Sequence, residues 1–266
     1  MCLLMLAWQA HPRYRLVVAA NRDEYHERPA APLSKWPPPG EMLAGRDLHA
    51  QGTWLGVDRR RRFGVVTNFR ELRPPRPQAP SRGSLVPRYL GAVPGAPATQ
   101  RAREFFVALE PHALRYSGFN LLLSDEDSLW YGSNRATPFA RALPPGLYGL
   151  ANELLDTPWP KLQRVRFGFE ALLREPRPPA EALFALLADR TPTLEEASPT
   201  AASGLPREWA RALSAPFVLH PEYGTRCSTV LLLEEDGRMY LAERRFDPAG
   251  ELAGETVFAL HAAQWP

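Results

Sequence analysis

The residue types best suited to covalent chemistry begin at the start of the chain, where Cys2 precedes an apolar run from Leu3 to Trp8. A small residue behind the initiator methionine allows methionine aminopeptidase to remove Met1, which would leave Cys2 with a free α-amine. A thiol and an α-amine on one residue are the layout of an N-terminal nucleophile, in which the amine serves as the general base. The alternative is that Cys2 is a small hydrophobic residue in a buried strand.

A charged segment, Asn21-Arg22-Asp23-Glu24, ends the apolar stretch that is predicted to pair with the strand of Cys2. The turn between the two stretches places residues near 20 opposite residues near 2. Arg22 would then lower the pKa of the Cys2 thiol, and Asp23 would hold the α-amine in place. The alternative is a charged strand end whose side chains make solvated salt bridges.

Other kinds of catalytic site have no support in the sequence. The chain contains neither a G-x-x-x-x-G-K nor a G-x-G-x-x-G loop for phosphates, and it has no G-x-S-x-G turn. Its six histidines show no metal-ligand spacing, and none forms a recognisable motif with either cysteine. We therefore expect no metal and no cofactor, and we expect the α-amine of Cys2 to be the base.

The composition is that of a globular protein, with 45% hydrophobic and 23% charged residues among 266. No apolar run approaches the length of a membrane span, and the first residues lack the basic region of a signal peptide. Two cysteines cannot make a disulfide framework, which favours a reduced, cytoplasmic location. We expect no membrane span.

The basic residues are nearly all arginine, since Lys35 and Lys161 are the only lysines among 32 basic residues. The densest basic run, Arg59 to Arg62, lies between two strand-like segments and is predicted to be a solvated hairpin turn. No aromatic residues are interleaved with it, so we expect no nucleic-acid partner.

Runs of strands and runs of helices are predicted to alternate along the chain. Strands are expected over 2–8, 14–20, 52–58, 62–69, 119–123, 128–131, 228–233, 239–244 and 255–260. Helices are expected over 81–90, 99–109 with Thr99 as N-cap, 158–173, 179–187 and 207–213. Residues 29–39 and 72–80 are predicted to be surface loops because proline disrupts ladder pairing. This segregated order favours an α+β fold with two antiparallel sheets covered by helices, and we predict one domain over residues 1–266.

Short motifs occur in order along nearly the whole chain: Cys2, Asn21–Glu24, Gly52–Val57, Thr67-Asn68, Ser81–Gly83, Gly118–Leu121, Gly149–Asn152, Asp156–Lys161 and Tyr223–Thr229. Together they resemble the NRDE family, the group of transport and Golgi organisation proteins. Ala151 and Cys227 depart from the pattern, because serine is usual at both positions. The family is in turn similar to N-terminal nucleophile hydrolases, which implies a four-layer αββα sandwich with two mainly antiparallel sheets between helical layers.

The resemblance implies a role for each matched residue. Cys2 would be the nucleophile with Arg22 and Asp23 beside it, and Arg226 would be a second positive charge near the thiol. Asn152 would donate a hydrogen bond to the oxyanion. Residues expected to bind substrate are Asn21, Trp54, Asn68 and Asn120.

Each of these residues also has a structural interpretation. Asn152 would cap the helix near residue 158, and Arg226 would pair with Asp23 or Glu24. The tryptophans Trp54 and Trp159 would pack in the core, as would Cys227, and Asn68 and Asn120 would form turns.

Two functions remain open on this reading. The leading one is a hydrolase, an amidase that cleaves a small-molecule C–N amide bond through a thioester on Cys2. The alternative is a non-catalytic protein that binds or transfers a hydrophobic ligand. The resemblance implies haem or acyl-CoA and lipids as such ligands, because eukaryotic relatives are linked to them.

Overall fold

A computed structural model describes residues 2–38, 40–71, 78–91, 101–193 and 205–266. The chain divides into two units that each contain one sheet. The first unit comprises residues 1–27, 145–151 and 155–264, and the second comprises 28–144, 152–154 and 265–266. Each unit is therefore built from separate stretches of the chain.

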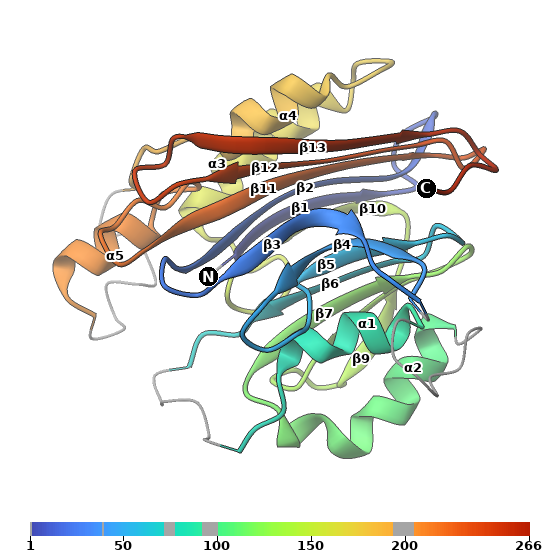
Figure 1. Cartoon of the computed structure of the whole chain (residues 1–266), viewed down its shortest axis with the longest axis horizontal. Coiled ribbons are helices and arrows are strands. Elements are labelled where there is room, and N and C mark those ends of the chain that lie inside the picture. Colours follow the sequence, from blue (N-terminus) through green and yellow to red (C-terminus); the bar gives the residue numbers. More distant parts are fainter. Residues whose placement is uncertain (1, 39, 72–77, 92–100, 194–204) are drawn as a thin grey trace. The chain divides into compact units, whose positions relative to one another are not determined.

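The first unit contains a six-stranded sheet in the order β10-β1-β2-β11-β12-β13, in which every neighbouring pair is antiparallel (Figure 1). Its strands are β1 (Cys2–Trp8), β2 (Tyr14–Tyr25), β10 (Gly146–Leu150), β11 (Tyr223–Glu234), β12 (Met239–Phe246) and β13 (Leu252–Leu260). The hairpin of β1 and β2 is confirmed, with Leu4 opposite Ala20.

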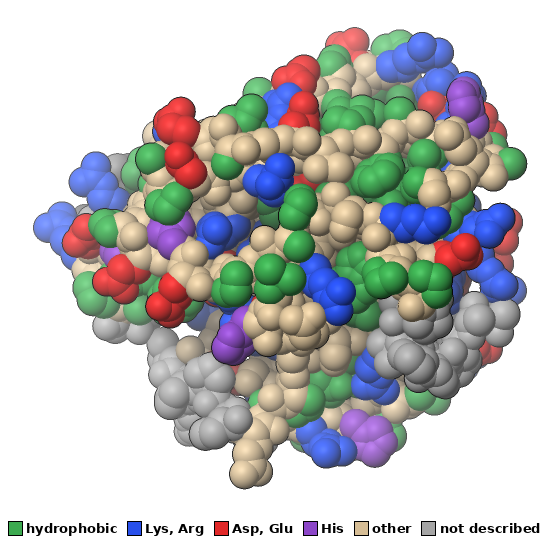
Figure 2. All heavy atoms as spheres, in the orientation of Figure 1, with side chains coloured by type: hydrophobic (Ala, Val, Ile, Leu, Met, Phe, Trp, Pro, Cys, Tyr) green, Lys and Arg blue, Asp and Glu red, His purple; other side chains and the backbone are tan. Residues whose placement is uncertain are grey.

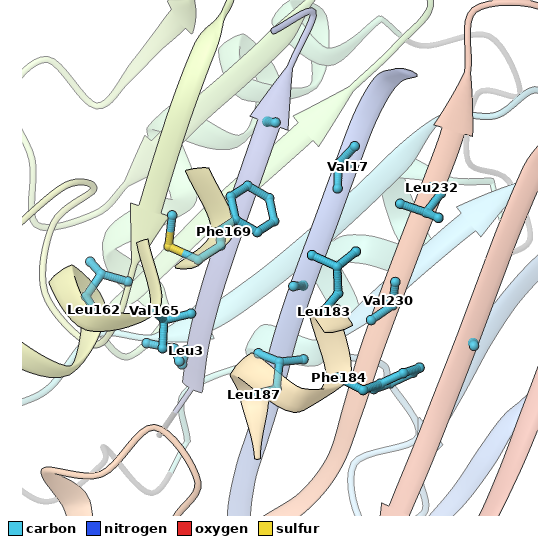
Figure 3. Close-up of a cluster of buried hydrophobic side chains, with 14 of the residues drawn as sticks. Leu3, Val17, Leu162, Val165, Phe169, Leu183, Phe184, Leu187, Val230 and Leu232 are labelled. Carbon is cyan, nitrogen blue, oxygen red and sulfur yellow. The ribbon is translucent and has the colours of Figure 1, made fainter. Parts of the chain in front are cut away.

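Two helices cover one face of this sheet, α3 (Pro160–Leu172) and α4 (Ala180–Leu187), and a third, α5 (Arg207–Leu213), precedes β11. Alternate residues of the strands point at α3 and α4, because successive strand side chains face opposite sides. Figure 3 shows this contact, with side chains of the strands packed against those of the two helices. Burying each leucine or phenylalanine stabilises the fold by about 1.5–3 kcal/mol.

The second unit contains a seven-stranded antiparallel sheet in the sequential order β3 to β9. The strands are β3 (Ala30–Lys35), β4 (Met42–Asp47), β5 (Leu55–Asp58), β6 (Phe63–Asn68), β7 (Phe119–Ser124), β8 (Leu129–Ser133) and β9 (Ala140–Leu143). Its helices are η1 (Arg82–Ser84), α1 (Leu85–Tyr89), α2 (Ala102–Leu109) and η2 (Glu110–Arg115). Aromatic side chains of α1 and α2 join the core of this unit. A Cβ at Gly132 would lie 2.3 Å from the ring of Phe106, so α2 requires a glycine there.

The α+β class with two antiparallel sheets and helices is confirmed, whereas the proline-rich loop predicted over 29–39 is wrong in part. Residues Ala30–Lys35 form β3, an edge strand that pairs with β4 and has an irregular register between Ala31 and Ser34. Pro32 falls within that irregularity, where no ladder hydrogen bond is lost. Strands β4, β9 and β10 were not predicted. Most of the loop predicted over 72–80, and Thr99, lie outside the described residues.

The basic run at 59–62 does form the β5–β6 turn, but it is not fully solvated. Arg61 and Arg62 are buried, and the guanidinium of Arg62 pairs with Asp58. On the face drawn in Figure 2, Lys and Arg side chains lie scattered among Asp and Glu rather than in one patch. Among the residues described, no helix is both long enough and apolar enough to cross a membrane.

Candidate functional site

Strand pairing in the first unit brings three of the predicted residues together. Cys2, the first residue of β1, lies opposite Arg22 of β2, and Arg22 lies opposite Cys227 of β11 on its other side. The register of β11 shifts between Thr225 and Cys227, which leaves Arg226 as an extra residue in that strand. Such a bulge redirects a side chain and is common next to active sites.

Arg22 and Arg226 have different partners. Arg22 is 6% exposed and lies 3.8 Å from the Glu24 carboxylate. Arg226 donates from Nη1 to the backbone carbonyls of Tyr25 and His26, at 3.0 and 2.9 Å. Burial lowers the pKa of Arg226, and the positive charge of Arg22 lowers it further.

Asp23 is the buried carboxylate of this region. Its Oδ1 accepts a 2.7 Å hydrogen bond from the Thr225 hydroxyl, and Thr225 Oγ1 in turn accepts one from the backbone N–H of Val218. Burial raises the pKa of Asp23, and the positive charge of Lys161 and the Thr225 hydrogen bond oppose that rise. Asp23 is thus held in a fixed orientation with a cation nearby.

Lys161 supplies that cation from the first turn of α3. Its side chain is 1% exposed, and Nζ donates a 2.9 Å hydrogen bond to the Leu213 carbonyl at the end of α5. A lysine is almost never fully buried unless it is paired. Lys161 is therefore a buried cation whose charge acts on Asp23.

Asn21 has structural partners on both sides of its amide. Its Nδ2 donates to the carbonyls of Leu187 and Pro216, and its Oδ1 accepts from the Ser228 hydroxyl at 2.6 Å. These bonds tie the end of α4 and the segment before β11 to the sheet. They occupy both functional atoms of the Asn21 side chain.

Asn152 belongs to the second unit, where it is 2% exposed. Its Nδ2 donates to the carbonyl of Asn68 at 3.0 Å, and its backbone carbonyl accepts from the N–H of Arg70 at 2.7 Å. The first residue of α3 is Pro160 and its N-cap is Trp159, so Asn152 does not cap that helix. Its Oδ1 is buried with no hydrogen-bond partner among the residues described.

Asn120 supports the short segment that carries Asn152. It is fully buried on β7, donates from Nδ2 to the Glu153 carbonyl at 2.8 Å, and accepts at Oδ1 from the Tyr131 hydroxyl at 2.8 Å. Trp54 lies one residue before β5, and its backbone carbonyl accepts from Val66 at 2.8 Å. The hydrogen bonds of Asn120 thus hold the segment of Asn152 and Glu153 against β7.

The predicted residues therefore fall into two sets, one in each unit. Cys2, Asn21, Arg22, Asp23 and Arg226 lie on the adjacent strands β1, β2 and β11. Asn68, Asn120 and Asn152 are linked by hydrogen bonds in the second unit, directly or through Glu153.

Sequence reasoning did not select Lys161 or Thr225. Both lie inside the quoted motifs, and Lys161 is one of only two lysines in an arginine-rich chain. The rarity of lysine in this chain was the one sequence signal that could have pointed to Lys161. The carboxylate on which its charge acts, Asp23, lies about 140 residues away along the chain, so no local pattern reports it.

Comparison with known proteins agrees with the quoted motifs. Residues 1–248 match the family model described as Transport and Golgi organisation 2. The chain is 35% identical over 262 residues to the transport and Golgi organization protein 2 homolog of Bos taurus and 34% identical over 263 residues to that of Homo sapiens, with 92% of each chain covered. It is 27% identical over 278 residues to the Drosophila melanogaster protein, covering 94% of this chain and 95% of that one.

Among solved structures, the chain is similar to the penicillin V acylase of Agrobacterium tumefaciens, with a TM-score of 0.48 and 12% sequence identity. That match covers 99% of this chain and 93% of the acylase chain.

Proposed function

The chain belongs to the Transport and Golgi organisation 2 family, and from that premise we propose that it is a cysteine N-terminal nucleophile hydrolase that cleaves a small-molecule C–N amide bond. The observation that carries the proposal is the strand register, which pairs Cys2 with Arg22 next to the bulge at Arg226. Thiolates form more readily beside guanidinium groups. The proposal includes a single domain over residues 1–266 and a cytoplasmic location.

The proposed reaction begins when the α-amine of Cys2, freed by removal of Met1, takes the thiol proton. The sulfur attacks the carbonyl carbon of the amide, and the carbonyl electrons move to oxygen. When the C–N bond breaks, the α-ammonium returns its proton to the departing amine, and an acyl thioester remains on Cys2. Water then adds to the thioester, loses its proton to the α-amine, and releases the carboxylic acid and the thiol.

The neighbouring residues receive roles that fit their partners. Arg22 and Arg226 stabilise the thiolate. Asp23, fixed by Thr225, orients the α-ammonium group, and the charge of Lys161 opposes the rise in the Asp23 pKa that burial causes. The role that the family resemblance implies for Asn152 is donation to the oxyanion, and its Nδ2 has a second hydrogen for this because the first is directed at Asn68.

The first experiment compares alkylation of Cys2 and Cys227 by iodoacetamide, read by peptide mass spectrometry, with intact mass reporting the loss of Met1. We expect strong preference for Cys2, with an apparent pKa below the usual thiol value of about 8.5. Cys227 is 4% exposed and serves as the internal control. Retention of Met1 throughout active protein would rule out the α-amine mechanism, and equal or absent labelling would favour the binding function.

Once an amide that the protein hydrolyses has been identified, Asn152→Ala tests the oxyanion donor. We expect turnover to fall by about 100- to 1,000-fold, the usual loss when one such donor is removed. Circular dichroism checks the fold of the variant. A loss below tenfold in a folded variant would contradict the role of Asn152.

The alternative, a carrier of a hydrophobic ligand, predicts different results. Acyl-CoA would raise the melting temperature where the free acid does not, or haem would give a Soret band on mixing. Either result with an unreactive Cys2 would replace the hydrolase proposal.

A further inference from the structure

Arg70 is a cation of the second unit that the proposed reaction does not use. It follows β6 by two residues and is half-buried, and its backbone N–H donates to the Asn152 carbonyl at 2.7 Å. Its Nη1 is shielded from solvent and has no hydrogen-bond partner within the described part of the chain. Burial lowers the pKa of Arg70, and the negative charge of Glu153 opposes this only in part.

Glu71, the residue after Arg70, and Arg82 both have hydrogen-bond partners. Glu71 accepts from Arg135 and from the backbone N–H of Gly118, and Arg82 donates to the Gly118 carbonyl at 2.8 Å. Arg70 Nη1 therefore differs from Glu71 and Arg82 in having no hydrogen-bond partner among the described residues. A shielded guanidinium nitrogen without an acceptor is costly, and a bound anion would offset that cost.

Asn152 presents a second unsatisfied atom close to Arg70. Its amide orientation is determined, because a flip would turn Oδ1 toward the carbonyl oxygen of Asn68 that now accepts from Nδ2. Oδ1 therefore remains a buried acceptor without a donor in the residues described. A ligand that satisfies both residues must carry an oxyanion for Arg70 and an N–H for Asn152.

We propose that Arg70 and Asn152 form a binding site for the charged end of the ligand, in which the guanidinium binds an oxyanion and Asn152 Oδ1 accepts from a neighbouring N–H. The oxyanion is a carboxylate or a phosphate. Resting on the proposed function, this makes the substrate an amide that carries a carboxylate or a phosphate. Two parallel N–H···O bonds from arginine suit either oxyanion.

The test measures ligand binding by NMR at constant ionic strength with N-acetylglycine, its neutral counterpart N-acetylglycinamide, and inorganic phosphate. We expect an oxyanion to bind and the neutral amide to bind at least about tenfold more weakly, since hydrogen bonds to charged groups are strong. Arg70→Gln should weaken anion binding by about tenfold or more. Glu153→Gln should strengthen it by about twofold, because a nearby negative charge is removed.

Arg103→Gln, an exposed arginine on α2, is the matched control and should leave anion binding unchanged. Arg70→Gln should also melt at the same or a higher temperature without ligand, whereas a purely structural arginine would lower it. Binding of N-acetylglycine assigns a carboxylate, and binding of phosphate alone assigns a phosphate-bearing ligand.

Equal binding of the acid and the neutral amide, or unchanged anion binding in Arg70→Gln, would overturn the site. The anion site and the hydrolase proposal can be tested separately. If Cys2 is unreactive but anion binding depends on Arg70, the proposed function fails and the anion site stands.

Discussion

Two buried charged clusters of this chain can be compared directly, one at the β5–β6 turn and one at the strand end of the first unit. In the turn cluster, Arg62 Nε donates to Asp58 Oδ2 at 2.8 Å, and the backbone N–H groups of Arg60 and Arg62 donate to Asp58 Oδ1 at 3.0 and 2.9 Å. The Arg62 guanidinium also lies over the Tyr89 ring, 5.0 Å from its centre. Each of these three hydrogen bonds joins residues no more than four apart in the sequence.

The strand-end cluster contains Arg22, Asp23, Lys161 and Arg226, which come from segments far apart in the sequence. Here the positive charge of Arg22 lowers the pKa of Arg226, and the buried Asp23 carboxylate accepts a hydrogen bond from the Thr225 hydroxyl with cations acting on it from other segments. A self-contained ion pair such as the turn cluster stabilises a local structure. A cluster with perturbed charges and distant origins is typical of a functional site.

Breaking the turn cluster should have the largest effect on stability. Asp58→Asn leaves the buried Arg62 cation without its counter-ion, and we expect a loss of about 3–5 kcal/mol in the free energy of unfolding, measured in urea. Cys2 labelling of the folded fraction should not change. Replacing both residues, Asp58→Leu with Arg62→Met, should recover most of the loss. A cost below about 1 kcal/mol would show that the pair is not a stabilising element.

The isosteric change in the other cluster, Asp23→Asn, should show the opposite profile. We expect the rate of iodoacetamide labelling at Cys2 to fall by about tenfold or more, because the group that orients the α-amine is lost. Stability should fall less than in Asp58→Asn, since the amide oxygen can still accept from Thr225 and no carboxylate is buried. If instead Asp23→Asn unfolds the protein and leaves labelling intact, the strand-end cluster is structural too.

The comparison also shows what local sequence patterns can and cannot predict. The pairing of Cys2 with Arg22 was predictable, because apolar strands joined by a short turn set their own register. The bulge that places Arg226 depends on β11 pairing with β2 across about 200 residues. The burial of Arg62 was missed because a run of arginines was interpreted by composition, although Asp58 lies only four residues away.

In the second unit, too, the environment of a backbone position and of a side chain depended on tertiary contacts that the local sequence does not show. Pro32 argued against a strand, yet β3 tolerates it at the sheet edge, where one side of the ladder needs no partner. Asn152 was assigned two roles from sequence, a helix cap and an oxyanion donor. The cap is excluded because Trp159 is the N-cap of α3, and Asn152 instead donates to the Asn68 carbonyl, a contact that depends on the tertiary fold.

A smaller effect concerns the pH dependence of stability. Burial raises the pKa of Asp23 in the folded protein, so the folded state holds this proton more tightly than the unfolded state. Its contribution is fully present below the unfolded pKa of about 3.9 and is lost as the pH rises through the folded value. We expect the wild type to lose stability relative to Asp23→Asn as the pH rises from about 4. Urea midpoints of both proteins across that range test this, and the opposite slope would show that the nearby positive charges and the Thr225 hydrogen bond outweigh burial.

The smallest effect is expected for a third pair, Arg59 and Glu41, because Arg59 shares the turn with Asp58 but is exposed. The two groups are 3.4 Å apart with 61% and 51% of their side chains exposed. Water and salt screen such a pair, so a double-mutant cycle to alanine should give a coupling below about 0.5 kcal/mol, falling further in high salt. A coupling near that of Asp58 and Arg62 would mean that the charges of the turn, rather than their burial, stabilise it. Burial would then no longer explain why the turn cluster is stabilising, and the contrast with the strand-end cluster would lose its basis.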